Sequence, residues 1–232
     1  MPDTTVEFGK PVAPQTPDGR LDTPAFHRNH AAIGSALEAV LRGRTGDVIE
    51  FGSGSGQHAV AFARRLPTIT WWPSDLNDDH LRSIAAWRAQ AKLENPKLEN
   101  LRAPVRLDAS ESDWRLRERG LPAEFLAIFC ANVIHIAPWA VAQGLFAGAG
   151  RHLRSDGRLL LYGPFKHDGQ HNAPSNAAFD ASLRSRNPQW GVRDTADLRK
   201  LAAANGLHLM DIAEMPSNNA ILVFERASVT PA

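Results

Sequence analysis

A glycine-rich loop is the first segment whose residue types could do chemistry. Gly52, Gly54 and Gly56 alternate with serines, between the apolar run 48–51 and a segment with helical spacing. Because glycine has no Cβ, the backbone N–H groups of such a loop can approach a ligand closely. A loop between a buried strand and a helix is typical of nucleotide-type cofactor sites. The spacing alone leaves the cofactor open, because counting from Gly54 to Ala59 also gives the dinucleotide pattern Gly-x-Gly-x-x-Ala.

Three acidic residues lie at the expected carboxyl ends of strands around this loop. Glu50 could meet the positive amino group of an amino-acid moiety, or pair with a helix N–H group. Asp75 follows the second predicted strand, where a carboxylate can accept hydrogen bonds from both ribose hydroxyls. Asp108, with Ala109 next to it, follows the third predicted strand and could accept a hydrogen bond from the exocyclic amine of adenine. A helix cap or a turn is the alternative role for both aspartates.

These residues together favour S-adenosylmethionine over NAD as the cofactor. Glu50 would attract an amino group, whereas it would repel a pyrophosphate. The glycine loop, Glu50, Asp75 and Asp108 resemble the cofactor site of class I S-adenosylmethionine-dependent methyltransferases. An NAD-dependent oxidoreductase and a catalytically silent cofactor-binding partner protein remain as alternatives.

Few further catalytic residues are expected for methyl transfer, because the protein need only hold a nucleophile in line and accept its proton. His135 is the candidate base, since its ordinary pKa of about 6.5 suits proton removal near neutrality; a histidine bonded to backbone is the alternative. Asn132 could orient the substrate, contact the cofactor or satisfy a strand end. Tyr162 could face the substrate or bond to backbone. Arg28 could pair with the carboxylate of the cofactor or make a surface salt bridge.

The polar segment 166–172 suits a lid over the reacting methyl group. It contains His167, Asp168 and His171. Because the sequence shows no second convincing ligand cluster, we expect no metal site here.

Alternating strands and helices would position all these residues. Strands are predicted at 48–51, 69–72, 105–107, 125–130 and 157–162, helices at 25–41, 57–66, 78–91, 139–153, 175–184 and 195–205, and two final strands at 207–213 and 220–224. Strands that interleave with helices indicate a parallel sheet covered on both faces. The last two strands are joined directly and must pair antiparallel. The predicted fold is therefore α/β and Rossmann-like, with a seven-stranded, mostly parallel sheet and a C-terminal antiparallel hairpin.

Further motifs narrow the resemblance. They are, in chain order, Phe26–Asn29, Gly52–Ala59, Trp72–Asp75, Asn132–Trp139, Tyr162–Lys166, Ser175–Arg184, Trp190–Asp194 and Met215–Asn219. On these motifs, from about Phe26 to Phe224, the chain resembles the methyltransferase-like 26 family. The resemblance implies the class I methyltransferase fold and binding of S-adenosylmethionine. It supplies no defined acceptor, and we expect a small molecule with an oxygen, nitrogen or sulfur nucleophile.

Composition limits the remaining possibilities. The 232 residues are 43% hydrophobic and 22% charged, which predicts one domain at 25–232 after an extended proline-rich arm at 1–24. The formal charge of +1 gives no support for a nucleic-acid partner. Cys130 is the only cysteine, so an intramolecular disulfide is excluded. Without a recognisable targeting segment or membrane span, a cytoplasmic location is expected. The oligomeric state cannot be read from these patterns.

Overall fold

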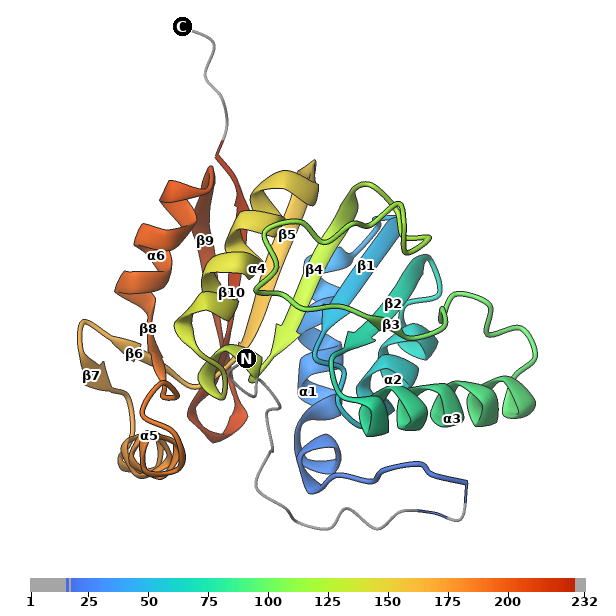
Figure 1. Cartoon of the computed structure of the whole chain (residues 1–232), viewed down its shortest axis with the longest axis horizontal. Coiled ribbons are helices and arrows are strands. Elements are labelled where there is room, and N and C mark those ends of the chain that lie inside the picture. Colours follow the sequence, from blue (N-terminus) through green and yellow to red (C-terminus); the bar gives the residue numbers. More distant parts are fainter. Residues whose placement is uncertain (1–15, 17, 228–232) are drawn as a thin grey trace, which may run out of the picture. The chain divides into compact units, whose positions relative to one another are not determined.

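The computed structural model describes residue 16 and residues 18–227 of the chain. These residues fall into two compact units that divide after Asp108. Each unit has its own strands and helices (Figure 1). In this described part, no helix combines the length and the apolar content that crossing a bilayer requires.

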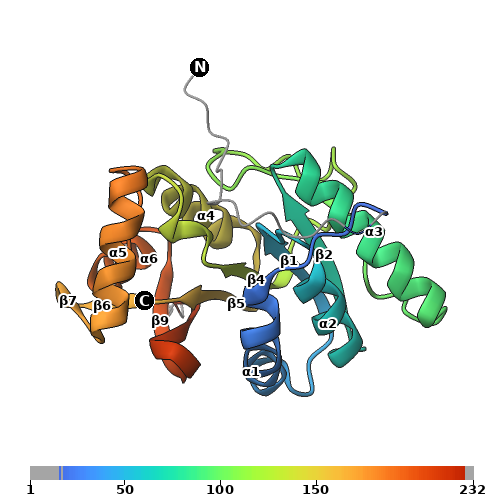
Figure 2. The same ribbon diagram turned by 90° about the horizontal axis from the view of Figure 1, so that it is seen from below.

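The first unit is a parallel three-stranded sheet with three helices. Its elements are α1 (Pro24–Leu41), β1 (Gly46–Phe51), α2 (Gln57–Arg65), β2 (Ile69–Asp75), α3 (Asp78–Glu94) and β3 (Val105–Arg106). The strand order is β3-β2-β1, and both pairings are parallel. Helix α2 packs against both α1 and α3 (Figure 2). The register pairs Phe51 with Ser74 and Asp75 with Arg106, so the carboxyl ends of the three strands meet at one edge.

The second unit contains four further strands in the order β4-β5-β10-β9. Its main elements are β4 (Phe125–Ala131), α4 (Trp139–His152), β5 (Leu153–Gly163), α5 (Pro174–Arg186), α6 (Thr195–Ala204), β9 (Leu207–Met215) and β10 (Asn219–Arg226). Strands β4 and β5 pair parallel, whereas β10 runs antiparallel to both β5 and β9. Two short 3-10 turns, η1 (Val133–His135) and η2 (Pro216–Asn218), follow β4 and β9.

These elements confirm the predicted α/β fold. The two units supply seven strands that match the seven predicted, and the last two strands form the predicted antiparallel hairpin. Two details differ from the prediction. The strand predicted at 157–162 begins earlier, because β5 starts at Leu153, and its pairing with β4 shifts register near that end. A second, three-stranded sheet in the order β7-β6-β8 was not predicted; its strands are β6 (Phe165–His167), β7 (Gln170–His171) and β8 (Arg193–Asp194).

The segment 166–172, which was expected to be a lid loop, is largely a hairpin of this small sheet. Lys166 pairs with His171, and Asp168 and Gly169 form the turn with φ angles of 50° and 81°. Two successive residues with positive φ are typical of a type I′ hairpin turn, for which Asp-Gly is a favoured sequence. Strands of two or three residues are too short to show a period-2 pattern, which explains why the hairpin was missed.

The end of the predicted N-terminal arm is attached to the first unit. Residues 1–15 and 17 lie outside the described part of the chain. The backbone N–H of Leu21 donates to Ser83 Oγ at 2.8 Å, and the indole of Trp87 donates to the carbonyl of Leu21 at 2.8 Å. Arg20 lies 4.7 Å from the centre of the Trp87 ring. Helix α1 begins directly afterwards at Pro24, with Thr23 at the N-cap. The boundary between arm and domain remains a prediction.

Candidate functional site

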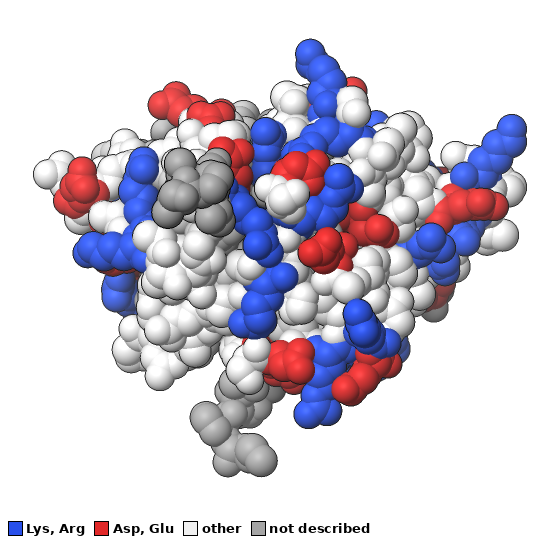
Figure 3. Space-filling view, turned by 90° about the horizontal axis from the view of Figure 1, so that it is seen from above, with Lys and Arg blue, Asp and Glu red and all other residues white. Residues whose placement is uncertain are grey.

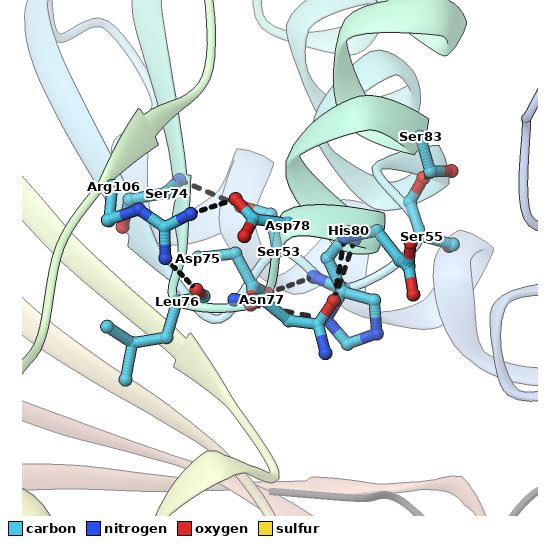
Figure 4. Close-up of polar contacts among 12 residues, drawn as sticks. Ser53, Ser55, Ser74, Asp75, Leu76, Asn77, Asp78, His80, Ser83 and Arg106 are labelled. Carbon is cyan, nitrogen blue, oxygen red and sulfur yellow. Dashed lines mark hydrogen bonds and ion pairs between the residues drawn. The ribbon is translucent and has the colours of Figure 1, made fainter. Parts of the chain in front are cut away.

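The carboxylate of Asp75, at the end of β2, joins the glycine loop to the start of α3 (Figure 4). Its Oδ2 accepts a hydrogen bond from Gly54 N at 2.9 Å. Its Oδ1 accepts one from Asn77 N at 2.9 Å and lies 3.2 Å from His80 Nδ1. Burial lowers the pKa of His80, but its hydrogen bond with Asp75 and the charge of that carboxylate outweigh burial and raise the pKa overall. These contacts hold the Asp75 carboxylate in one orientation.

The three glycines of the loop share a left-handed backbone, but Gly54 and Gly56 differ in the space around them. All three have left-handed backbones, with φ angles of 69° at Gly52, 56° at Gly54 and 87° at Gly56. A Cβ on Gly56 would lie 2.7 Å from Ile84 Cα, so this glycine lets α2 and α3 pack closely. A Cβ on Gly54 would meet no atom within 4 Å. The loop therefore has open space beside Gly54, next to the N–H group that contacts Asp75.

Buried serines connect the loop to its neighbours. The N–H of Ser53 donates to the carbonyl of Ser74 at 2.9 Å, and the N–H of Ser74 donates back to Ser53 Oγ at 3.2 Å. Ser83 Oγ donates to the carbonyl of Ser55 at 2.7 Å, which fixes the loop to α3. Each of these four side chains is buried. None of the four was predicted as a site residue, although Ser53 and Ser55 alternate with the glycines in the sequence.

Glu50 lies at the carboxyl-terminal part of β1, as predicted, but its partner was not foreseen. The side chain is buried, and its Oε2 accepts a hydrogen bond from Trp71 Nε1 at 2.9 Å. Burial raises the pKa of Glu50 to about 7, and the charge of Asp75 adds to the rise; hydrogen bonds from Trp71 and Ser53 oppose it. The partner is an indole N–H, rather than the helix N–H that was considered from the sequence.

Asp108 and Arg28, the two other charged residues predicted to bind the cofactor, differ in burial. The N–H of Leu107 donates to the carbonyl of Asp75 at 3.3 Å, so Asp108 follows β3 at the same edge and is half-buried. Arg28 is exposed on α1 and forms no ion pair with any residue that the structure describes. Its pairing with a cofactor carboxylate remains a prediction.

The second unit contains Ala109, Asn132 and Tyr162. Ala109 and Tyr162 are buried, while Asn132 is half-buried directly after β4. The backbone of Asn132 is left-handed, with φ of 63°, and its N–H donates to the carbonyl of Tyr162 at 2.8 Å. A left-handed non-glycine residue costs about 1–3 kcal/mol and often occurs at functional sites. The roles predicted for all three residues remain predictions.

His135 has the contacts of a structural histidine. Its side chain is 0% exposed, and Nδ1 accepts a hydrogen bond from Arg193 N at 3.3 Å. Nε2 is buried without a partner among the described residues and would lie 2.4 Å from a Cβ on Gly163. Burial lowers the pKa of His135 to about 3, and the charge of Arg193 adds to this. A base must reach the proton that it removes, so these contacts support the alternative of a histidine bonded to backbone.

Three residues of the segment 166–172 have side chains that can bind a metal ion: His167, Asp168 and His171. Across residues 18–227, no group of three or more His, Cys, Asp or Glu side chains is arranged to hold a metal ion.

Comparison with known proteins places this chain in a family. Residues 20–226 match the family model described as "Protein of unknown function (DUF938)". The chain belongs to the DUF938 family. The match covers both compact units of the DUF938 protein and all the elements described above.

Solved structures resemble the DUF938 protein in fold. The S-adenosylmethionine-dependent methyltransferase SibL is 20% identical with a TM-score of 0.67, over 88% of this chain and 56% of SibL. An O-methyltransferase family protein from Burkholderia thailandensis is 15% identical with a TM-score of 0.64, over 86% of this chain and 60% of that one. The O-methyltransferase NcsB1 from neocarzinostatin biosynthesis is 17% identical with a TM-score of 0.64, over 87% of this chain and 54% of NcsB1. The DUF938 chain thus spans little more than half the length of these proteins and shares their fold.

Proposed function

We propose that this DUF938 protein is an S-adenosylmethionine-dependent methyltransferase that acts on a small molecule through an oxygen, nitrogen or sulfur nucleophile. The observation that carries the proposal is the hydrogen bond from Gly54 N to Asp75 Oδ2, at the carboxyl ends of the neighbouring strands β1 and β2. This is the edge where ligands bind in open α/β sheets. On the motifs described above, we further propose that the DUF938 protein belongs with the methyltransferase-like 26 proteins.

The residues of the first unit fit this cofactor. Asp75 Oδ2 accepts one N–H group from the described residues, and a carboxylate oxygen has room for a second donor such as a ribose hydroxyl. The open space beside Gly54 allows a ligand to approach the loop backbone. Asp108 follows the next strand and would receive the adenine amine. Glu50 would act through the loop that it supports, because its carboxylate is buried against Trp71.

The bound cofactor would supply a methyl group activated by a sulfonium. Transfer of that methyl group to an acceptor held in line would leave S-adenosylhomocysteine as the second product. An O–H, N–H or S–H acceptor also loses a proton. We propose that His135 supports β8 through its hydrogen bond with Arg193 N and does not accept this proton. Its side chain is buried, and burial lowers its pKa to about 3. Asn132 and Tyr162 are proposed to orient the acceptor, and Asn132, Ala109 and Arg28 to contribute to cofactor binding.

A small acceptor is supported by two observations. NcsB1, which shares the fold, was solved in complex with S-adenosylmethionine and 2-hydroxy-5-methyl naphthoic acid. The surface of the DUF938 protein mixes both charge signs on the face shown in Figure 3, as its formal charge of +1 suggests. An interspersed surface gives little attraction to a polyanion. The expected cytoplasmic location is part of the same proposal.

Titration calorimetry with S-adenosylhomocysteine tests the cofactor, with NAD as the comparison ligand. Asp75→Asn should weaken S-adenosylhomocysteine binding by about 10- to 100-fold, the usual effect of losing hydrogen bonds to a charged group. Asp79→Asn is the matched control, because Asp79 is an exposed carboxylate in the first turn of α3 and should change affinity less than about twofold. NAD binding equal to that of S-adenosylhomocysteine, or no binding of S-adenosylhomocysteine, would overturn the proposal.

Turnover is tested separately with methyl-labelled S-adenosylmethionine and a panel of phenols, amines and thiols. Label transfer to any of these supports the enzyme. Tight cofactor binding without transfer to any acceptor would favour the catalytically silent partner protein instead.

A further inference from the structure

A pocket of about 540 Å³ lies in the second unit and is lined by residues of α4, α5, α6, β8 and β6. Figure 1 labels these elements. It is lined by Trp139, Lys166, Arg184, Val192, Arg193, Asp194, Asp197, Lys200 and Leu201. Helix α6 packs on both β6 and β8, which are paired with each other. None of the proposed cofactor or acceptor residues lines this pocket, so it is an additional site. Its volume is in the range of small-molecule pockets.

The cations of the pocket outnumber the carboxylates that face them. Lys166 and Arg184 share one carboxylate, that of Asp180, which is 7% exposed. Lys166 Nζ lies 3.4 Å from Asp180 Oδ2, and Arg184 Nε lies 3.1 Å from Oδ1. Asp180 also accepts the N–H of Val192 at 2.8 Å, and the ring of His171 lies 3.2 Å from its Oδ2. One negative charge therefore faces two full positive charges, which leaves an excess of one positive charge.

Arg193 adds a positive charge that no carboxylate contacts among residues 18–227. Its Nε donates to the carbonyl of Ile134 at 2.8 Å, and its Nη2 donates to the carbonyls of Ala137 and Gln189 at 2.6 and 2.9 Å. Burial lowers the pKa of Arg193, and the charge of Arg184 adds to this, while the charge of Asp180 opposes it. Arg193 therefore adds a positive charge whose hydrogen bonds, among residues 18–227, go to backbone carbonyls.

The two acidic residues of the pocket already have donors. Asp194 accepts backbone N–H groups from Gly169 at 2.6 Å and Ala196 at 2.8 Å. Asp197 accepts a hydrogen bond from Lys200 Nζ at 3.4 Å, and both of these side chains are well exposed. With Asp180 included, the pocket has four cationic side chains and three carboxylates. A ligand with a single negative charge would neutralise this excess of one positive charge.

Apolar side chains also line the pocket. Val192 is buried, Leu201 contributes from α6, and the Trp139 ring lies 5.5 Å from the Arg193 guanidinium carbon. Aromatic and aliphatic walls bury the apolar body of a ligand, while a few charged groups fix its orientation. We infer that this pocket binds a small monoanion with a planar apolar body, such as an aromatic carboxylate.

Titration calorimetry with 2-naphthoate tests this site, with the neutral isostere 2-naphthamide as the comparison ligand. Naphthoate should bind at least about tenfold more tightly than naphthamide, because only the carboxylate can pair with the cations. Acetate, which lacks the apolar body, should bind more weakly than either. Equal binding of naphthoate and naphthamide, or no binding of naphthoate, would overturn the inference.

Matched variants on the same helices locate the site. Lys200→Gln should weaken naphthoate binding about threefold and Arg184→Gln about tenfold, according to how exposed each cation is. Arg199→Gln and Arg186→Gln are the controls, because both are exposed on α6 and α5 and do not line the pocket. Equal effects in variants and controls would show nonspecific charge attraction and contradict the inference. Urea unfolding of each variant checks that the fold is retained.

The outcome is separable from that of the proposed function. The same samples are titrated with S-adenosylhomocysteine, and Lys200→Gln should leave that affinity unchanged. Naphthoate binding without S-adenosylhomocysteine binding would uphold the pocket and overturn the methyltransferase proposal.

Discussion

The backbone N–H of Gly54 donates to Asp75 Oδ2 at 2.9 Å, although the two residues are 21 positions apart. The parallel pairing of β1 with β2 brings them together, because Phe51 and Ser74 are partners in the register. Asp75 is also held by Asn77 and lies beside His80. A change in the loop should therefore alter the position of the carboxylate proposed to bind ribose.

The first prediction separates the roles of two loop glycines. Gly56→Ala should lower the free energy of unfolding by about 2–4 kcal/mol, because it adds a left-handed alanine and a clash with the backbone of Ile84. Gly54→Ala should cost only about 1–2 kcal/mol, since its Cβ would enter open space. Urea unfolding measures both values. Equal losses in the two variants would show that packing against α3 does not decide the effect.

The second prediction concerns Glu50 and pH. The pKa of Glu50 is raised from 4.5 to about 7 in the folded protein, so the folded state binds more protons than the unfolded state between these values. Stability from this group is present below pH 4.5 and is lost as the pH rises to 7. Glu50→Gln removes this pH-dependent loss of stability and keeps a side-chain oxygen that can accept the hydrogen bond from Trp71 Nε1. Relative to wild type, the variant should gain up to about 3 kcal/mol between pH 4.5 and pH 8.

Urea unfolding at pH 4.5 and pH 8 measures the gain. Glu99→Gln, an exposed glutamate outside the loop, is the control and should show no such gain. The same difference from wild type at both pH values would contradict the burial of a titrating Glu50.

The third prediction has the opposite sign and concerns His135. Its pKa is lowered to about 3, so the unfolded state binds more protons between about pH 3 and 6.5 and stability rises with pH across that window. His135→Gln removes this penalty but loses the buried packing. Relative to wild type, the variant should therefore lose about 3 kcal/mol less free energy of unfolding at pH 4 than at pH 7.

Unfolding at these two pH values is compared with that of His208→Gln, since His208 is about half exposed. If His135 were instead a catalytic base, its variant would show unchanged stability and a lost rate at every pH.

The fourth prediction concerns the attachment of residues 22 and 23 to the loop. Gln57 Oε1 accepts the N–H of Thr23 at 2.9 Å, and Gln57 Nε2 donates to Asp22 Oδ1 at 2.8 Å. Gln57→Ala should cost about 1–2 kcal/mol of stability and speed hydrogen exchange at Thr23. Gln90→Ala, on the exposed face of α3, is the control. Unchanged exchange at Thr23 would show that this segment is held without Gln57.

Local patterns determined much of this protein. Most of the helices and the longer strands bury apolar positions at regular spacing, which hydrophobic periodicity predicted. Helix α5 differs, because its buried residues are Asn176, Asp180 and Leu183. The glycine loop and Asp75 were expected at strand ends for a similar reason, because each follows a segment with the pattern of a strand, and the structure has them there. These features depend on residues near one another in sequence.

Tertiary structure alone decided the remaining features. His135 is buried because Gly163 and Arg193, distant in sequence, close around its ring. Glu50 has its raised pKa because its side chain is buried, and the charge of Asp75 on the neighbouring strand β2 adds to the rise. Strand β8 is too short for any periodic signal, and it pairs with β6 only where the chain returns after α5. Burial and pairing of this kind depend on residues far apart in sequence, so no local pattern could reveal them.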